Sequence, residues 1–323
     1  MKKLAPAIAL LLASFIAIYV GAVQIDNFWA ALLSPGSNEI LWQIRIPRVT
    51  AGLIVGASLA LAGLMAQGAC NNALAEPSIL GTTAGASLGT VLAVLTGVVQ
   101  VGSIGAIVCG ALGALAATSL TFKLASLRSQ LSSFALIIVG IAVSAIFTAI
   151  VGLLSAMVTR ADARSISFWN FGSLALITRD NLIGITITAI IGGAIAWKIS
   201  PSLDRLSLGD ATAFHLGEDV PRVRLIALVA LSVLAGGAVS TVGSIAFIGL
   251  AAPHIARFIY GPTHRALIVH TAIIGALLVV VADTLSRTLA QPGELPIGLV
   301  TSLIGAPVLI ALVSVKNNVW KTQ

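Results

Sequence analysis

The histidines, cysteines and acidic residues are the side chains best suited to chemistry, and their spacing does not match a catalytic or metal site. The four histidines, His215, His254, His264 and His270, fall in different segments, and no His/Cys/Asp/Glu set has the spacing of metal ligands. We find no Ser-His-Asp arrangement and no GxxxxGKS/T phosphate loop. We therefore expect a chain that is not an enzyme and holds no catalytic residue, metal or cofactor of its own.

The longest polar run, residues 203–224, is the other candidate for a functional segment. Its charged and titratable members are Asp204, Arg205, Asp210, His215, Glu218, Asp219, Arg222 and Arg224. Apolar stretches of about 20 residues, long enough to cross a bilayer, flank the run. Gly209 and Asp210 can begin a short helix that Gly217 ends. A helix this polar cannot lie in lipid, so it is either a docking element for a soluble partner or part of a solvated loop.

The composition identifies the class of protein. The 323 residues are 58% hydrophobic and 9% charged, and the mean hydropathy is +1.06. A soluble domain of this composition could not cover its surface with polar groups, so we expect a polytopic helical membrane protein with one domain over residues 1–323. The net charge of +7 does not indicate nucleic-acid binding, because the basic residues are scattered between apolar segments. Cys70 and Cys109 lie in apolar segments and are expected to act as small hydrophobic residues.

The apolar runs predict the elements that position the polar run. We expect about ten membrane-spanning helices. They cover residues 4–23, 49–69, 78–98, 103–122, 132–158, 182–198, 225–242, 245–259, 266–285 and 297–315. The first run also has the basic start and apolar core of a signal peptide, but its length favours an uncleaved span. Residues 160–180 carry an amphipathic piece that is expected to lie along the surface or re-enter the membrane.

The distribution of Lys and Arg predicts the orientation. With ten spans, both termini and residues 203–224 share one side of the membrane, and twelve of the 18 Lys and Arg residues fall on that side. Because cytoplasmic loops are enriched in Lys and Arg, we expect the termini and the polar run in the cytoplasm of a multi-pass cell-membrane protein. Few ionisable groups lie within the spans, which disfavours a proton-coupled carrier and favours an external source of energy.

An ordered set of motifs resembles one family of membrane proteins. The set is RIPR at 45–48, NALAEP at 72–77, LGD at 208–210, GSIAFIGL at 243–250, PHIAR at 253–257 and ELPIG at 294–298. It is similar to the FecCD-type permeases, the membrane subunits of ATP-binding-cassette (ABC) importers for iron–siderophores, haem and vitamin B12. The resemblance covers nearly the whole chain and implies the all-α, type II importer architecture with both termini cytoplasmic.

The resemblance also implies roles for individual residues. The segment that couples transport to the ATPase would comprise Leu208, Gly209, Asp210, Ala211, Ala213, Leu216 and Gly217. Three arginines, Arg45, Arg48 and Arg287, match residues that pair with acidic groups of a solute-binding protein, and we expect them to be exposed on the outer side. The cytoplasmic gate would include Asn72, Leu74, Ser132 and Ser133, although the family usually has proline where this chain has Ala73.

The resulting hypothesis is a permease subunit that performs no reaction itself. Its expected partners are a dimer of ABC ATPase subunits that bind ATP and Mg, an extracytoplasmic solute-binding protein, and a second permease subunit, identical or paralogous. An iron–siderophore complex is the favoured cargo because it is the commonest in the family, and haem and cobalamin are the alternatives. A secondary transporter that works without an ATPase is the alternative from a different class, and a structural membrane scaffold is the third.

Overall fold

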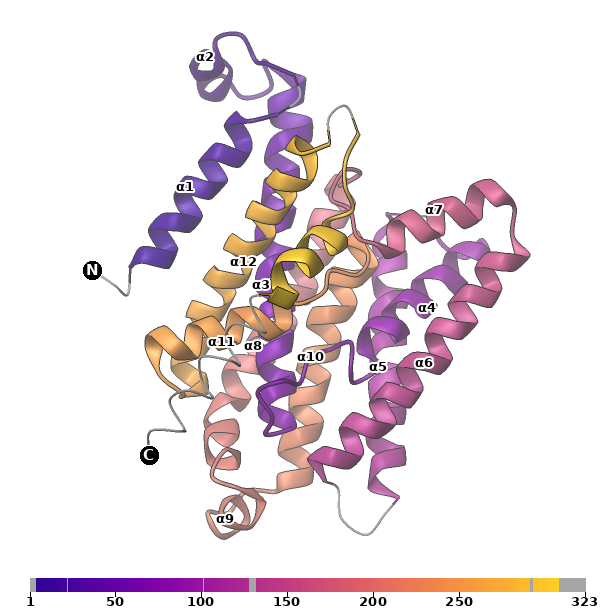
Figure 1. The fold of residues 1–323 in the computed structure, drawn as a ribbon, viewed down its shortest axis with the longest axis vertical. Helices are drawn as coiled ribbons and strands as arrows, with labels where there is room; N and C mark the ends of the chain where they lie inside the picture. The colour runs from indigo at the N-terminus through magenta and orange to yellow at the C-terminus, as the bar shows by residue number, and fades with distance from the viewer. Residues whose placement is uncertain (1–3, 22, 101, 128–131, 291–292, 308–323) are drawn as a thin grey trace.

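The computed structural model describes residues 4–21, 23–100, 102–127, 132–290 and 293–307, and only the backbone of residues 160–163. Every regular element in this part of the chain is a helix (Figure 1). The helices are α1 (Ala5–Tyr19), α2 (Phe28–Leu33), the π-helical η1 (Ile40–Arg45), α3 (Ile46–Ala69), α4 (Thr82–Leu95), α5 (Ile104–Ser126), α6 (Ser133–Met157), α7 (Arg160–Asn170), α8 (Arg179–Leu206), α9 (Asp210–His215), α10 (Val220–Val242), α11 (Ile248–Tyr260), α12 (His264–Thr288) and a last helix over Ile297–Pro307.

Within the described residues, six helical stretches are long and apolar enough to cross a membrane. They are Ile40–Ala69, Ile104–Ser126, Ser133–Met157, Arg179–Leu206, Val220–Val242 and His264–Thr288. The remaining predicted runs contain shorter helices, which are α1, α4, α11 and the helix Ile297–Pro307. The fold is therefore all-helical and multi-pass, as predicted, while the count of ten spans and the side of each terminus stay predictions.

Small residues bring the central helix α3 into direct backbone contact with its neighbours. Gly56 of α3 faces Gly275 of α12, and Gly63 of α3 faces Gly249 of α11, with no room for a Cβ at either contact. Such close approach allows strong van der Waals packing between helices, which is the main source of helix association in lipid. Gly56 and Gly63 therefore form a packing face of α3 for α12 and α11.

Two prolines lie inside helices, and a neighbouring polar side chain satisfies the carbonyl that each leaves unpaired. Pro253 in α11 cannot donate to Gly249, and the Gln67 amide of α3 reaches that carbonyl oxygen at 3.5 Å. Pro201 in α8 has no N–H to donate to the Trp197 carbonyl oxygen, and the Ser200 hydroxyl donates to that oxygen instead, at 2.8 Å. Because an unpaired backbone group is costly in an apolar environment, these side chains help the two helices to continue through their prolines.

The polar run 203–224 is more helical than the sequence analysis predicted. The span predicted over residues 182–198 continues as α8 to Leu206, because Leu203 and Leu206 are buried against the helix bundle. The short helix predicted at residues 210–216 is α9, and α10 begins at Val220, earlier than predicted, with the Asp219 carboxylate accepting from the Arg222 N–H at 3.2 Å. The segment is thus two helix ends joined through α9.

The amphipathic piece predicted within residues 160–180 and the first apolar run both form helices. The former is α7, which is followed by a non-helical stretch that leads into α8. The latter is α1, which packs against α12, with Ala17 fully buried beside Val49 and Val280. That this first run is not cleaved stays a prediction.

Candidate functional site

The helix α9 stands at one end of the molecule (Figure 1). Positive φ angles at Gly209 (100°) and Gly217 (85°) bring the chain into and out of the helix, a conformation that glycine adopts without strain. Ala213 faces inward and is buried, while Leu208, Phe214 and Leu216 are 62%, 69% and 54% exposed. An apolar surface on so short and polar a segment is typical of a site that a partner covers.

Ion pairs join α9 and its flanks to the body of the protein. Asp210, the first residue of α9, pairs with Arg224 of α10 at 3.0 Å. Glu218 pairs with Arg205 near the end of α8. These pairs join both flanks of α9 to α8 and α10.

The predicted gate residues Asn72 and Leu74 lie in the connection between α3 and α4. The Asn72 carboxamide oxygen accepts from the Leu74 N–H at 2.9 Å, which is an Asx turn that does not need the proline usual at position 73. Leu74 is half exposed. Burial raises the pKa of the Glu76 carboxyl in the same connection, and a hydrogen bond from the Ser78 hydroxyl opposes that shift.

The other two gate residues begin α6. Ser132 is the N-cap, and its hydroxyl accepts from the Ala135 N–H at 3.1 Å. Ser133 lies 3.2 Å from the Arg224 guanidinium, which also binds Asp210 of α9. For these described residues no hydrogen bond joins Asn72 or Leu74 to either serine. The structure therefore links half of the predicted gate to α9 and leaves the other half in the adjacent connection.

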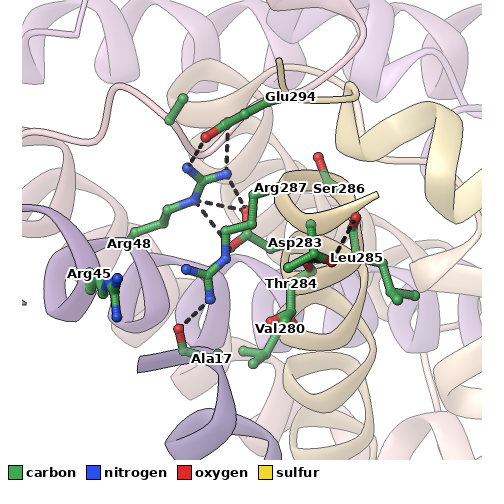
Figure 2. A network of polar contacts seen from close by, with 12 residues as sticks. Ala17, Arg45, Arg48, Val280, Asp283, Thr284, Leu285, Ser286, Arg287 and Glu294 are labelled. Atoms are coloured by element: carbon green, nitrogen blue, oxygen red, sulfur yellow. Dashed lines mark hydrogen bonds and ion pairs between the residues drawn. The ribbon is translucent and has the colours of Figure 1, made fainter. Parts of the chain in front are cut away.

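The three predicted docking arginines lie together at the other end of the molecule, where α3 begins and α12 ends (Figure 2). Arg48 occupies the centre, with its guanidinium between two carboxylates. It donates to Asp283 at 2.8 and 3.0 Å and to both oxygens of Glu294 at 2.8 and 2.9 Å. Both pairs are bidentate, which fixes the orientation of each acid.

The two other arginines bind backbone carbonyl groups around the C-terminal end of α1. Arg45 donates to the carbonyl oxygens of Ile18 and Tyr19 at 2.9 and 2.7 Å, and also to that of Val23. Arg287 donates to the carbonyl oxygen of Ala17 and lies 3.7 Å from Asp283. Cations at these carbonyls satisfy groups that the helix cannot pair internally and favour the negative end of its dipole.

The predicted exposure of these arginines is wrong. Arg45, Arg48 and Arg287 are only 5%, 6% and 8% exposed, because carboxylates and carbonyl groups of the same chain surround them. Their role in docking stays a prediction, since burial within one chain does not test it. Glu294, whose side chain is 34% exposed, is the part of this cluster that faces outward.

The sequence analysis gave no individual role to four residues that the structure places at these sites. Phe214 is an exposed aromatic residue of α9, and Arg224 contacts both α9 and α6. Asp283 and Glu294 are the partners of Arg48. Two sequence signals could have identified two of these residues. Phe214 is an aromatic residue within a polar run, and Asp283 is an acid near the end of an apolar helix, where an acid needs a cationic partner.

Comparison with known proteins gives a consistent match over the chain. The FecCD transport family matches residues 8–315. The iron(3+)-hydroxamate import system permease protein FhuB of Bacillus subtilis is 36% identical over 92% of this chain and 79% of that protein. The ferric enterobactin transport system permease protein FepD of Escherichia coli is 36% identical over 95% and 93%. The vitamin B12 import system permease protein BtuC of Vibrio cholerae is 32% identical over 93% and 91%.

A solved structure supports the same relationship at the level of the fold. It is described as an inward-facing conformation of a metal-chelate type ABC transporter. The two chains superpose with a TM-score of 0.84 at 30% identity, over 96% of this chain and 97% of the other. The helical arrangement in Figure 1 is thus shared with an ABC transporter permease along nearly the whole sequence.

Proposed function

The chain belongs to the FecCD transport family, and from this premise we propose that it forms the membrane pathway of a binding-protein-dependent ABC importer for an iron–siderophore complex. It is a transport permease subunit of an ABC transporter, as its relatives are. In the proposed cycle a binding protein delivers the cargo, two permease subunits enclose the pathway, and two ATPase subunits use ATP and Mg to switch access. The domain is the whole chain, residues 1–323, with residues 203–224 as its cytoplasmic coupling segment.

The observation that carries this proposal is the surface of α9. Exposed Leu208, Phe214 and Leu216 present apolar area to water, and covering such area stabilises a complex by about 25 cal/mol per Å². The predicted coupling residues Gly209, Asp210, Ala211, Ala213 and Gly217 shape and fasten this helix. We assign α9 as the element that enters the ATPase subunit.

The cargo is proposed from the names of two relatives. The names of FhuB and FepD specify iron(3+)-hydroxamate and ferric enterobactin, both ferric siderophores, and each is 36% identical to this chain. Cobalamin and haem are the alternative cargoes, and the vitamin B12 permease is 32% identical. The ligand is expected to bind tightly only to the binding protein, because the exposed side of α6 carries apolar residues such as Ile138, Ile141 and Leu153.

The second permease subunit is proposed to pack against the side of the bundle that contains α6. Among the six long apolar stretches of the described chain, α6 is the least buried. A helix that lines a pathway between two subunits must be uncovered in one subunit alone. The gate residues Asn72, Leu74, Ser132 and Ser133 would close the cytoplasmic end of this pathway.

The docking proposal is revised by the structure of the arginine cluster. An acidic group of the binding protein can reach Arg48 where Glu294 now covers it. Arg45 and Arg287, which hold α1, would then support the docking surface from behind. This end of the molecule is opposite α9 in Figure 1, as alternating access between two partners requires.

Purification of the tagged protein in mild detergent tests the proposal. Mass spectrometry should identify a stoichiometric ABC ATPase, and ATP hydrolysis by the complex should rise when the binding protein is added. A homo-oligomer without an ATPase, reproduced after crosslinking, would instead favour the ATPase-independent secondary transporter. Ligand screening of a copurified binding protein then distinguishes a ferric siderophore from haem and cobalamin.

A further inference from the structure

The guanidinium of Arg224 is the meeting point of three segments that are far apart in the sequence. Its Nε donates to the carbonyl oxygen of Ala69 at 3.0 Å. One Nη2 donates to Asp210 Oδ1 at 3.0 Å and to the Ser133 hydroxyl at 3.2 Å. A single side chain thus contacts the end of α3, the first residue of α9 and the first residue of α6.

Each of the three contacts of Arg224 is made at a helix terminus, where it helps to fix the direction in which the chain enters or leaves that helix. Ala69 is the last residue of α3, and its carbonyl has no partner within the helix, so a cation there is favoured by hydrogen bonding and by the helix dipole. The connection that holds Asn72 and Leu74 starts at the next residue. Ser133 lies beside the N-cap of α6, and Asp210 opens α9.

The burial of Arg224 makes its three contacts costly to break. Arg224 is only 2% exposed, while the side chain of Asp210 is 49% exposed. The charge of Arg224 is costly to bury, and loss of an acceptor would leave N–H groups without a partner in a packed interior. If Asp210 moves, Arg224 and the groups that Arg224 binds must therefore move with it, or the hydrogen bonds of Arg224 must break.

We propose that Arg224 is the positioning residue that transmits movement of α9 to both halves of the cytoplasmic gate. This inference rests on the proposed function, in which an ATPase moves α9. When α9 shifts, Asp210 pulls the guanidinium, which in turn moves the first turn of α6 through Ser133 and the end of α3 through the Ala69 carbonyl. The guanidinium suits this task because it directs five N–H donors in a fixed plane, which a lysine cannot do.

The test uses the complete complex with its copurified ATPase, reconstituted in nanodiscs. A cysteine at the gate, Leu74→Cys, is placed in a background with Cys70→Ala and Cys109→Ala. Its rate of reaction with a polar maleimide is measured without nucleotide and after trapping with ATP and vanadate. Because Leu74 is half exposed, the reporter is accessible in at least one state.

Four variants are compared in this background. Arg224→Gln removes the charge and most donors, Arg224→Lys keeps the charge but cannot reach all three acceptors, and Asp210→Ala removes the contact to α9. The matched control is Arg179→Gln, which removes an exposed arginine at the first residue of α8, outside the coupling segment. Asp210→Ala decides the question if Arg224→Gln does not assemble.

The expected result is a nucleotide-dependent change in labelling rate of about fivefold or more in the background and in Arg179→Gln. In Arg224→Gln and Asp210→Ala the change should fall below about twofold while the ATPase still copurifies, and Arg224→Lys should be intermediate. A purely structural role would reduce the yield of complex without removing the response to nucleotide. A full response in Arg224→Gln or Asp210→Ala would overturn the inference alone, whereas a background complex without ATPase or response would overturn the proposed function as well.

Discussion

Arg48 Nη2 and Asp283 Oδ1 lie 2.8 Å apart, although 235 residues separate them in the sequence. The pair joins the beginning of α3 to the end of α12, and Glu294 completes it from the following connection. Both side chains of the pair are almost completely buried. An ion pair in this position orients α3 and α12 relative to each other, at the end of the molecule proposed to receive the binding protein.

The first prediction concerns this pair. Arg48→Gln and Asp283→Asn should each lower the stability of the purified protein by at most about 3–5 kcal/mol, because each leaves the partner charge buried with one counterion fewer. Glu294 still pairs with Arg48, and Arg287 still lies near Asp283. The double variant should cost about 1–3 kcal/mol less than the sum of the single variants. Thermal unfolding in detergent measures the effect. Arg179→Gln, at an exposed position, is the control, and strictly additive losses would show that the two groups do not interact.

The second prediction concerns docking of the binding protein. Glu294→Gln should tighten docking several-fold, because a neutral amide covers Arg48 less strongly than a carboxylate. Rising salt should weaken docking, since charges of opposite sign steer the association. Binding of the copurified binding protein to the complex in nanodiscs, measured at two salt concentrations, checks both effects. Equal affinity for Glu294→Gln and the unmodified chain would remove Arg48 from the docking surface.

The third prediction concerns α9. Phe214→Ala should reduce recovery of the ATPase by about tenfold, because burial of a phenylalanine side chain contributes about 1.5–3 kcal/mol. Phe258→Ala is the matched control, since Phe258 is 88% exposed but lies on α11. Quantitative copurification measures both variants at equal permease levels. Equal loss in the two variants would point to a general effect of removing exposed aromatic residues.

The fourth prediction concerns the contact between α3 and α11. Gly63→Ala should destabilise the protein by about 1–3 kcal/mol, because its methyl group has no space beside the Gly249 carbonyl. Gly193→Ala, in α8, meets open space and should be neutral or stabilising. The melting temperatures of the two variants provide the comparison. A stable Gly63→Ala variant would mean that the two helices can separate without loss.

The fifth prediction concerns the proline in α11. Gln67→Leu should cost about 1–3 kcal/mol, because the Gly249 carbonyl then loses its donor. Adding Pro253→Ala should recover part of this loss, because alanine restores the N–H that can pair with Gly249. Recovery would be incomplete, since Gln67 also accepts from Arg257. The unfolding temperatures of the single and double variants decide whether the second change compensates for the first.

Local chemistry made much of the fold and part of the site predictable. Gly209 and Gly217 marked the limits of α9 because left-handed backbone is readily available only to glycine. The length of the apolar runs predicted helices in the right places, since chain segments in lipid must pair their own backbone groups. Leu208 and Leu216, which the resemblance assigned to the coupling segment, are both exposed in the structure.

Tertiary partners account for what the sequence did not reveal. Arg45, Arg48 and Arg287 stand at the ends of apolar runs, so exposure was the natural expectation, yet carbonyl groups of α1 and two distant carboxylates bury them. The junction at Arg224 was missed for the same reason, because Ala69 and Ser133 lie 155 and 91 residues away in the chain. Side-chain reach across the bundle has no local sequence signal.

The contact of Gly63 with Gly249 limits how the transporter can change shape. No side chain separates the two backbones there, whereas Leu59 and Gln67, one turn away on the same face of α3, carry long side chains. Sliding α3 along α11 by one turn would therefore drive one of these side chains into the opposing backbone. The two helices can pivot about this point or travel together, but they cannot shear past each other. We therefore expect α3 and α11 to move as one rigid pair. The changes in helix position that open the pathway to one side of the membrane must then occur between other helices of the bundle.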